Sequence, residues 1–192
     1  MKKVKFRQIR LLVLILLIAA VGMACRLSLG SPAKPGDPIP VSTEAAGSFE
    51  GKVKTAVAQA QQDGRVAVAF SEEELTSYVA LQLQAQTDLP ISSPQIYLRD
   101  DKVQFFADYD SGSVTLPVRV IFEPQVDASG NARLKLESID MGAIAVPDAV
   151  QQRLQEEIDR AFLQALDNAG DQFTVETLSI QDGQLNLQGV KR

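Results

Sequence analysis

The chain contains no histidine and no tryptophan, and Cys25 is its single cysteine. Without histidine there is no Ser-His-Asp or Cys-His catalytic arrangement and no imidazole ligand for a metal ion. A lone cysteine forms neither an internal disulfide nor a cysteine-based zinc cluster. The sequence also lacks the glycine-rich motifs that cradle phosphates. We therefore expect a protein that is not an enzyme and that uses no cofactor and no metal.

Basic residues are scarce outside the amino terminus. The chain has 19 Lys and Arg against 24 Asp and Glu, a net charge of −5. Five of the basic residues fall within the first ten positions, so the remainder has 14 basic against 24 acidic residues, a balance of −10. An acidic surface argues against nucleic acid, whose binding relies on neutralising phosphates. It also argues against general adhesion to anionic bilayers.

The amino terminus has the pattern of an export signal. A basic segment, residues 1–10, precedes an apolar run over 11–24 that is short for a full membrane span. Cys25 follows Gly-Met-Ala, which resembles the bacterial lipobox, although Gly22 and Met23 depart from its usual residues. Either residues 1–24 are a cleaved signal peptide and Cys25 is lipidated, or the segment is an uncleaved anchor. Both alternatives predict a domain tethered at the extracytoplasmic face of the cell membrane.

Residues 25–47 form a predicted linker, with four prolines among small residues between 28 and 47. Such a composition favours an extended stalk that buries little. The remainder, residues 48–192, is predicted to be a single α+β domain. Its first elements are a helix from Phe49 capped by Ser48, a strand over 65–70, and a helix over about 72–86 that starts in a capping box.

Two short hairpins and one long strand pair follow. The connection 87–94 leads to a hairpin with an Asp100-Asp101 turn, and the carboxy-terminal hairpin turns at Asp182-Gly183. The expected pairs are Leu98 with Val103, Ile96 with Phe105, Ile180 with Leu185 and Leu178 with Leu187. Between them, residues 114–122 carry an apolar side chain at every second position and give one apolar face, the turn 127–131 follows, and a second strand continues from 132. That apolar face comprises Val114, Leu116, Val118, Val120 and Phe122.

A long amphipathic helix is predicted from Pro147, a favourable first helical position, to a stop at Gly170. Its apolar stripe includes Leu154, Ile158 and Phe162. Neither this stripe nor the apolar face of the strands can be buried alone. The predicted architecture is therefore a curved antiparallel sheet packed around this helix.

Two stretches of the sequence resemble known protein families. FSEEELTSYVALQL, which opens the second helix, and SIDMGAIAVPDAVQQRLQEEIDRAFLQAL resemble the YpmS-like bacterial envelope proteins and, more distantly, the LmeA-like envelope proteins. The resemblance covers about residues 65–190 and rests on pattern and order. It implies a small relative of the tubular (BPI-like) lipid-binding superfamily, with an apolar groove beside the long helix and no catalytic motif.

The functional hypothesis is that the domain binds a membrane lipid or another amphiphile in that groove. An assembly module with a filled core is the alternative. A calcium site at 108–110 or 127–131 and a two-carboxylate glycosidase are weaker alternatives, because acidic and small residues are also ordinary turn formers. The candidate residues for the groove are Phe105, Phe106, Leu116, Val118, Val120, Phe122, Leu154, Ile158 and Phe162.

Overall fold

The computed structural model describes residues 32–86, 89–128, 130–168 and 173–191, without the side chains of 161–168 and 173. The predictions for residues 1–24 and for lipidation of Cys25 lie outside these ranges, as do Gly170 and the side chain of Phe162. Residues 31–192 form one compact unit. Within the described ranges, no helix is long and apolar enough to cross a membrane.

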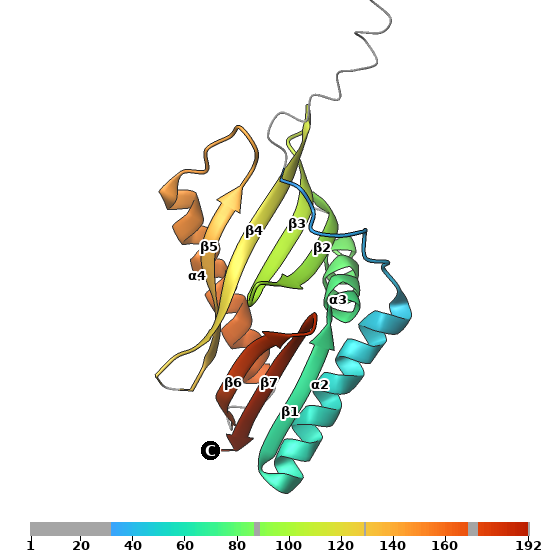
Figure 1. The fold of residues 1–192 in the computed structure, drawn as a ribbon, viewed down its shortest axis with the longest axis vertical. Coiled ribbons are helices and arrows are strands. Elements are labelled where there is room, and N and C mark those ends of the chain that lie inside the picture. The colour runs from blue at the N-terminus through green and yellow to red at the C-terminus, as the bar shows by residue number, and fades with distance from the viewer. Residues whose placement is uncertain (1–31, 87–88, 129, 169–172, 192) are drawn as a thin grey trace, which may run out of the picture. The chain divides into compact units, whose positions relative to one another are not determined.

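The strands form two antiparallel sheets (Figure 1). One has the order β1-β7-β6, and the other has the order β2-β3-β4-β5. Their bounds are β1 Arg65–Ser71, β2 Ile91–Arg99, β3 Lys102–Asp110, β4 Thr115–Val126, β5 Ala132–Asp140, β6 Phe173–Gln181 and β7 Gln184–Lys191. The α+β class with antiparallel pairing is therefore confirmed.

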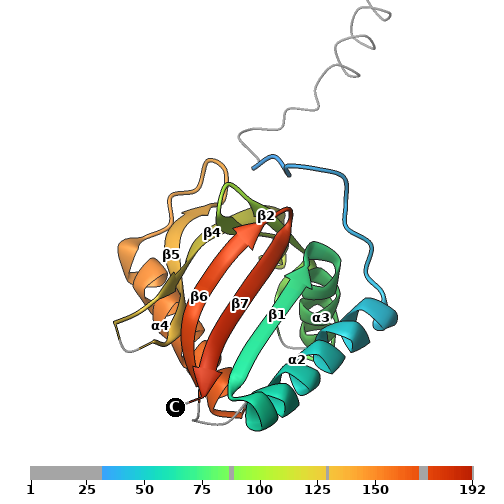
Figure 2. The same cartoon turned by 60° about the horizontal axis from the view of Figure 1, so that its bottom comes forward.

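The prediction of one curved sheet is wrong, because the carboxy-terminal hairpin pairs with the first strand. β7 has β6 on one edge and β1 on the other, so it has no edge left for the second sheet. The sheets meet at the β4–β5 turn, where the Val175 amide donates to the Gly130 carbonyl at 2.7 Å. Figure 2 shows β1, β7 and β6 side by side.

Helix α2, Thr43–Asp63, begins six residues before the predicted start. Ser42 is its cap, and its hydroxyl accepts from the Ala45 amide at 3.1 Å. Ser48, the predicted cap, lies within the helix instead, and its hydroxyl donates to the Glu74 carboxylate at 2.6 Å. Helix α3, Glu72–Gln84, starts in the predicted capping box between Ser71 and Glu74, which confirms that part of the prediction.

Both short hairpins form as predicted. Asp100, Asp101, Asp182 and Gly183 all have positive φ, which is the requirement of a two-residue type I′ turn. The four predicted cross-strand pairs are present in the register. β2 begins earlier than predicted, at Ile91, and it contains an irregularity between Ser92 and Gln95 beside a proline that cannot donate to the ladder.

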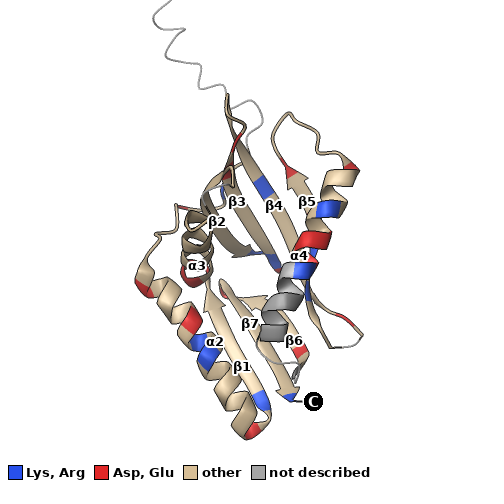
Figure 3. Ribbon diagram, turned by 180° about the vertical axis from the view of Figure 1, so that it is seen from behind, with Lys and Arg blue, Asp and Glu red and all other residues tan. Residues whose placement is uncertain are grey.

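Helix α4, Asp148–Asn168, lies against the β4–β5 side of the larger sheet (Figure 3). Leu154 and Ile158 pack against the hydrophobic core, as do Leu75 and Val79 of α3. The core itself consists of Ile96, Leu98, Val103, Val120, Phe122 and Ile180. Val114 departs from the prediction: it precedes β4 and is 57 % exposed, so it is not on the buried face.

Residues 32–42, which we call the strap, lie against the outer face of the larger sheet. The Ile39 amide donates to Gln95 Oε1 at 2.6 Å, and Gln95 Nε2 donates to the Ile39 carbonyl at 3.1 Å. The Tyr97 hydroxyl donates to the Asp37 carbonyl at 3.0 Å. Part of the predicted free stalk is therefore attached to the domain.

Candidate functional site

A hollow of about 700 Å³, which we call the groove, lies between the inner face of the larger sheet and α4. Its lining comes from the strands, from the connection 141–147 and from one side of α4. Apart from the phenol of Tyr109, every lining residue is apolar. The lining residues are Ile91, Phe105, Ala107, Tyr109, Val118, Val120, Phe122, Ile139, Met141, Ile144, Ala145, Val146, Pro147, Val150, Leu154 and Ile158.

The alternation of β3 and β4 produces this apolar wall. Phe105 pairs with Val120 and Ala107 pairs with Val118, so alternate residues face the groove over 105–109 of β3 and 118–122 of β4. Ala107 is the smallest of these residues. A small side chain opposite Val118 leaves space that larger residues in both positions would fill.

Polar contacts hold α4 at a fixed place beside the groove. Gln155 Oε1 accepts from the Leu136 amide at 2.5 Å, and Gln155 Nε2 donates to the Leu134 carbonyl at 3.1 Å. Arg133 pairs with Asp159 at 2.8 Å. Gln155 thus satisfies backbone groups of the edge strand β5, while Leu154 lines the groove beside it.

The connection between β5 and α4 closes one side of the groove. An isolated bridge joins Met141 to Ile144, and Gly142 has a φ of +70° between them. The Gln151 side chain donates to the Val146 carbonyl at 3.1 Å. This connection is almost entirely apolar, which is unusual for a surface loop, and all its residues except Gly142 and Ala143 line the groove.

Six of the nine predicted site residues line the groove: Phe105, Val118, Val120, Phe122, Leu154 and Ile158. Phe106 is on the opposite face of β3, 2 % exposed, with its ring edge-on to Tyr97. Leu116, paired with Tyr109, is not among the lining residues, and the side chain of Phe162 is not described. The sequence prediction missed the whole connection 141–147, although its apolar run MGAIAVP was a usable signal.

The comparison with known families decides the family of this chain. A family described as LmeA-like phospholipid-binding matches residues 36–190. The chain belongs to the LmeA-like phospholipid-binding family. This confirms the predicted LmeA-like resemblance, while the links to the YpmS-like family and to the tubular lipid-binding superfamily stay predictions. No curated protein and no solved structure gives a significant match.

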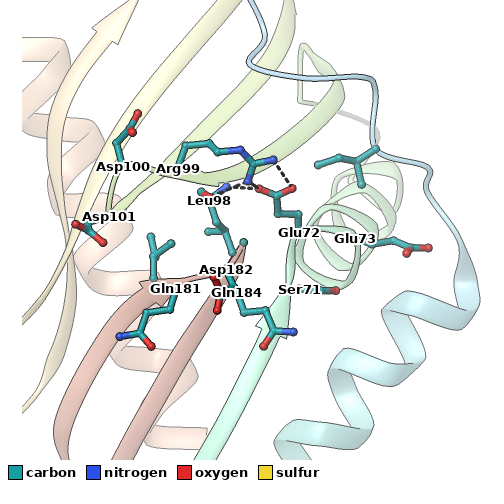
Figure 4. Close-up of a pocket in the computed structure, with 13 residues that line it drawn as sticks. Ser71, Glu72, Glu73, Leu98, Arg99, Asp100, Asp101, Gln181, Asp182 and Gln184 are labelled. Carbon is teal, nitrogen blue, oxygen red and sulfur yellow. Dashed lines mark hydrogen bonds and ion pairs between the residues drawn. The ribbon is translucent and has the colours of Figure 1, made fainter.

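This LmeA-like protein has a second, polar hollow of about 810 Å³ between the two hairpin turns and the start of α3 (Figure 4). Arg99 forms a two-pronged ion pair with Glu72, and the Leu98 amide donates to the same carboxylate at 2.6 Å. Four further carboxylates line the hollow, from Glu73, Asp100, Asp101 and Asp182. An acyl chain would gain nothing from this lining, whereas the apolar groove can remove one from water.

The described part of this family member contains no cluster of candidate metal ligands. No group of three or more Cys, Asp or Glu side chains there is placed to hold a metal ion. At the predicted alternative site 127–131, Asp127 accepts from the Asn131 amide at 2.9 Å. That contact is the ordinary way an Asp stabilises a turn.

Glu74 is the most deeply buried carboxylate of the described residues, at 7 % exposure. It accepts hydrogen bonds from Ser48 Oγ at 2.6 Å, Lys52 Nζ at 2.8 Å and the Ser71 amide at 2.9 Å. Burial alone raises the pKa of the Glu74 carboxyl, but these three donors outweigh it and hold the pKa below its ordinary value. This network joins α2 to the start of α3, away from the groove lining.

Proposed function

We propose that this protein is a non-enzymatic phospholipid-binding protein tethered at the extracytoplasmic face of the cell membrane. It holds a phospholipid with an acyl chain in the groove and the headgroup outside. The observation that carries the proposal is the lining of a groove of about 700 Å³, apolar except for the Tyr109 phenol, in a chain of a phospholipid-binding family. Its volume is within the range of about 300–1,000 Å³ for small-molecule sites.

The driving force is removal of methylenes from water. At about 0.8 kcal/mol per buried methylene, ten methylenes contribute about 8 kcal/mol before the costs of ordering are subtracted. Since no charged side chain lines the groove, the phosphate has no partner inside it. A phosphate buried without a partner is strongly unfavourable, so the headgroup stays in solvent.

The proposal is tested by purifying residues 32–192 and analysing an organic extract by mass spectrometry. We expect a phospholipid to co-purify and a fluorescent fatty-acyl probe to compete with it. Val118→Trp, which places a bulky ring opposite Ala107, should abolish both signals. Gln62→Trp on the exposed surface of α2 is the matched control and should bind normally. Absence of lipid and of probe binding in the unaltered protein would refute the proposal.

The tether is tested separately with the full chain. If Cys25 is lipidated, Cys25→Ala should abolish incorporation of a labelled fatty acid and leave an unprocessed chain. Unchanged size and membrane retention would favour the uncleaved anchor.

A further inference from the structure

One end of the domain gathers nearly all of its exposed large apolar side chains. The described residues leave six such side chains exposed, and five of them lie at the end where the groove begins, with exposures of 36–57 %. We call these five the apolar rim: Leu89, Tyr109, Val114, Ile144 and Val150. Exposed apolar residues are unremarkable when scattered, but a cluster of them marks an interaction surface.

The topology places the five side chains together. Tyr109 pairs with Ile91, and the Asp110 amide donates to the Pro90 carbonyl at 2.8 Å, so Leu89 lies beside the end of β3. Val114 is in the turn directly before β4. Ile144 and Val150 line the same groove as Tyr109 but come from the connection and the first turn of α4. The rim therefore surrounds the entrance of the groove on several elements.

The turn that carries Val114 satisfies several of its backbone groups internally. The Ser111 amide and hydroxyl both donate to the Val114 carbonyl, at 3.1 and 2.9 Å. The Gly112 amide donates to the Asp110 carboxylate at 2.8 Å. These backbone groups therefore have partners within the turn, and contact of the turn with the headgroup layer would leave the Asp110 carboxylate in water.

The strap begins at the same end. Figures 1 and 2 both place the first described residues, at the start of the segment 32–42, close to the ends of β3 and β4. The 31 residues that precede this segment carry the apolar run of the predicted tether. The chain therefore enters the domain on the side where the groove opens.

The charged residues near the apolar rim indicate whether neutral or anionic lipids would attract it. Asp110 and Asp148 are at this end of the domain, and Arg119 is already paired with Asp140 at 2.9 Å. Lys34, at the start of the strap, and Arg153, one turn after Val150 in α4, are exposed near the rim, but Asp110 and Asp148 offset their charge. A surface without an excess of positive charge gains little from anionic headgroups, so apolar contact is the interaction that would hold the rim on a membrane.

We propose that the apolar rim docks on the surface of a lipid bilayer, so that the entrance of the groove faces the acyl chains. This inference rests on the proposed function and adds the route by which a phospholipid enters the groove. The rim residues insert at the level of the headgroups, and the lipid moves between bilayer and groove without crossing bulk water.

The absence of tryptophan makes the test direct, since one introduced tryptophan is the only one in the chain. Full-length Val114→Trp, Ile144→Trp and Gln62→Trp proteins are each incorporated into phosphatidylcholine vesicles containing nitroxide-labelled phosphatidylcholine. We expect quenching of the tryptophan at 114 and 144 and none at 62, which is on α2 near its carboxyl end. Adding phosphatidylglycerol should not strengthen the quenching.

A second variant tests the rim itself. Leu89→Ser combined with Val114→Ser removes two rim side chains that do not line the groove, and it should strongly reduce quenching of the tryptophan at 144. Equal quenching at 62 and 144, or none at either, would overturn the docking proposal. So would a tryptophan at 114, which does not line the groove, whose emission is already blue-shifted without vesicles, because this indicates self-association through the rim.

Lipid carried by the Val114→Trp and Gln62→Trp proteins, whose substitutions leave the groove lining unchanged, is measured by mass spectrometry before vesicles are added. Bound lipid without rim quenching would refute docking alone. Rim quenching without bound lipid would refute the groove function and leave docking in place.

Discussion

The Glu74 network allows a prediction whose size follows from its contacts. Replacing Glu74 by Gln keeps the shape of the side chain but removes its charge. Three donors then face a neutral amide, one of whose terminal atoms is itself a donor. The Lys52 ammonium, 2.8 Å from the carboxylate, loses its ion-pair partner.

The loss of stability in Glu74→Gln can be estimated from the usual contribution of hydrogen bonds to a charged group. Hydrogen bonds to a charged group contribute about 1.5–3 kcal/mol each, but bonds that share one acceptor are not additive. Lys52 is 41 % exposed in its side chain, so solvent screens its part of the interaction. We therefore expect Glu74→Gln to lower the free energy of unfolding by about 2 kcal/mol at neutral pH, which is about 4–8 °C in Tm for a domain of this size.

The direction of the pH dependence follows from the lowered pKa of Glu74. A carboxyl whose pKa is lower in the folded state stabilises the fold above its unfolded pKa, and this contribution is lost as the pH falls through the folded pKa. The difference in the free energy of unfolding between the unaltered protein and Glu74→Gln should therefore be largest at pH 7 and should shrink below about pH 4.3. Urea unfolding of residues 32–192 at pH 7, 5, 4 and 3 measures it.

Glu73→Gln is the matched control, because Glu73 is in the same helical turn but is exposed. It should change stability by less than about 1 kcal/mol. If Glu74→Gln were no more destabilising than this control, or if its deficit grew on acidification, the account of a stabilising buried carboxylate would be refuted.

Two further predictions concern the strap and a glycine turn. Tyr97→Phe removes the hydroxyl that donates to the strap at 3.0 Å, and thermal unfolding should show a loss of about 0.5–1.5 kcal/mol; unchanged stability would mean that the strap does not stabilise the domain. Gly130→Ala should cost more than Gly112→Ala. Both glycines have positive φ, but only at 130 does an added Cβ collide with a neighbour, the side chain of Thr174. Equal losses in urea unfolding would contradict this clash.

Local rules explain the elements that the sequence predicted well. The turns at Asp100-Asp101 and Asp182-Gly183 fix the register of their hairpins within a few residues, so the pairs follow directly. The capping box at Ser71 and Glu74 likewise depends on residues three apart. In each case the partner that decides the structure is close in the sequence.

The misses are decided by partners that are distant in the sequence. β1 pairs with β7, more than a hundred residues away in the sequence, and no local sequence pattern predicts this pairing. The strap is held by Gln95, 56 residues from Ile39, so its proline-rich composition indicated a free linker. The groove was predicted only as far as its strands and helix, because the fold of 141–147 over it depends on where α4 packs.

Attachment of the strap shortens the part of the chain that can separate the domain from its anchor. If Cys25 is the anchored residue, twelve peptide units connect it to Asp37, whose carbonyl accepts from the Tyr97 hydroxyl. Fully extended, they span at most about 43 Å, whereas 22 units to Gly47 would span about 79 Å. The domain would then be restricted to a thin layer above the bilayer, with a high effective concentration of lipid at all times.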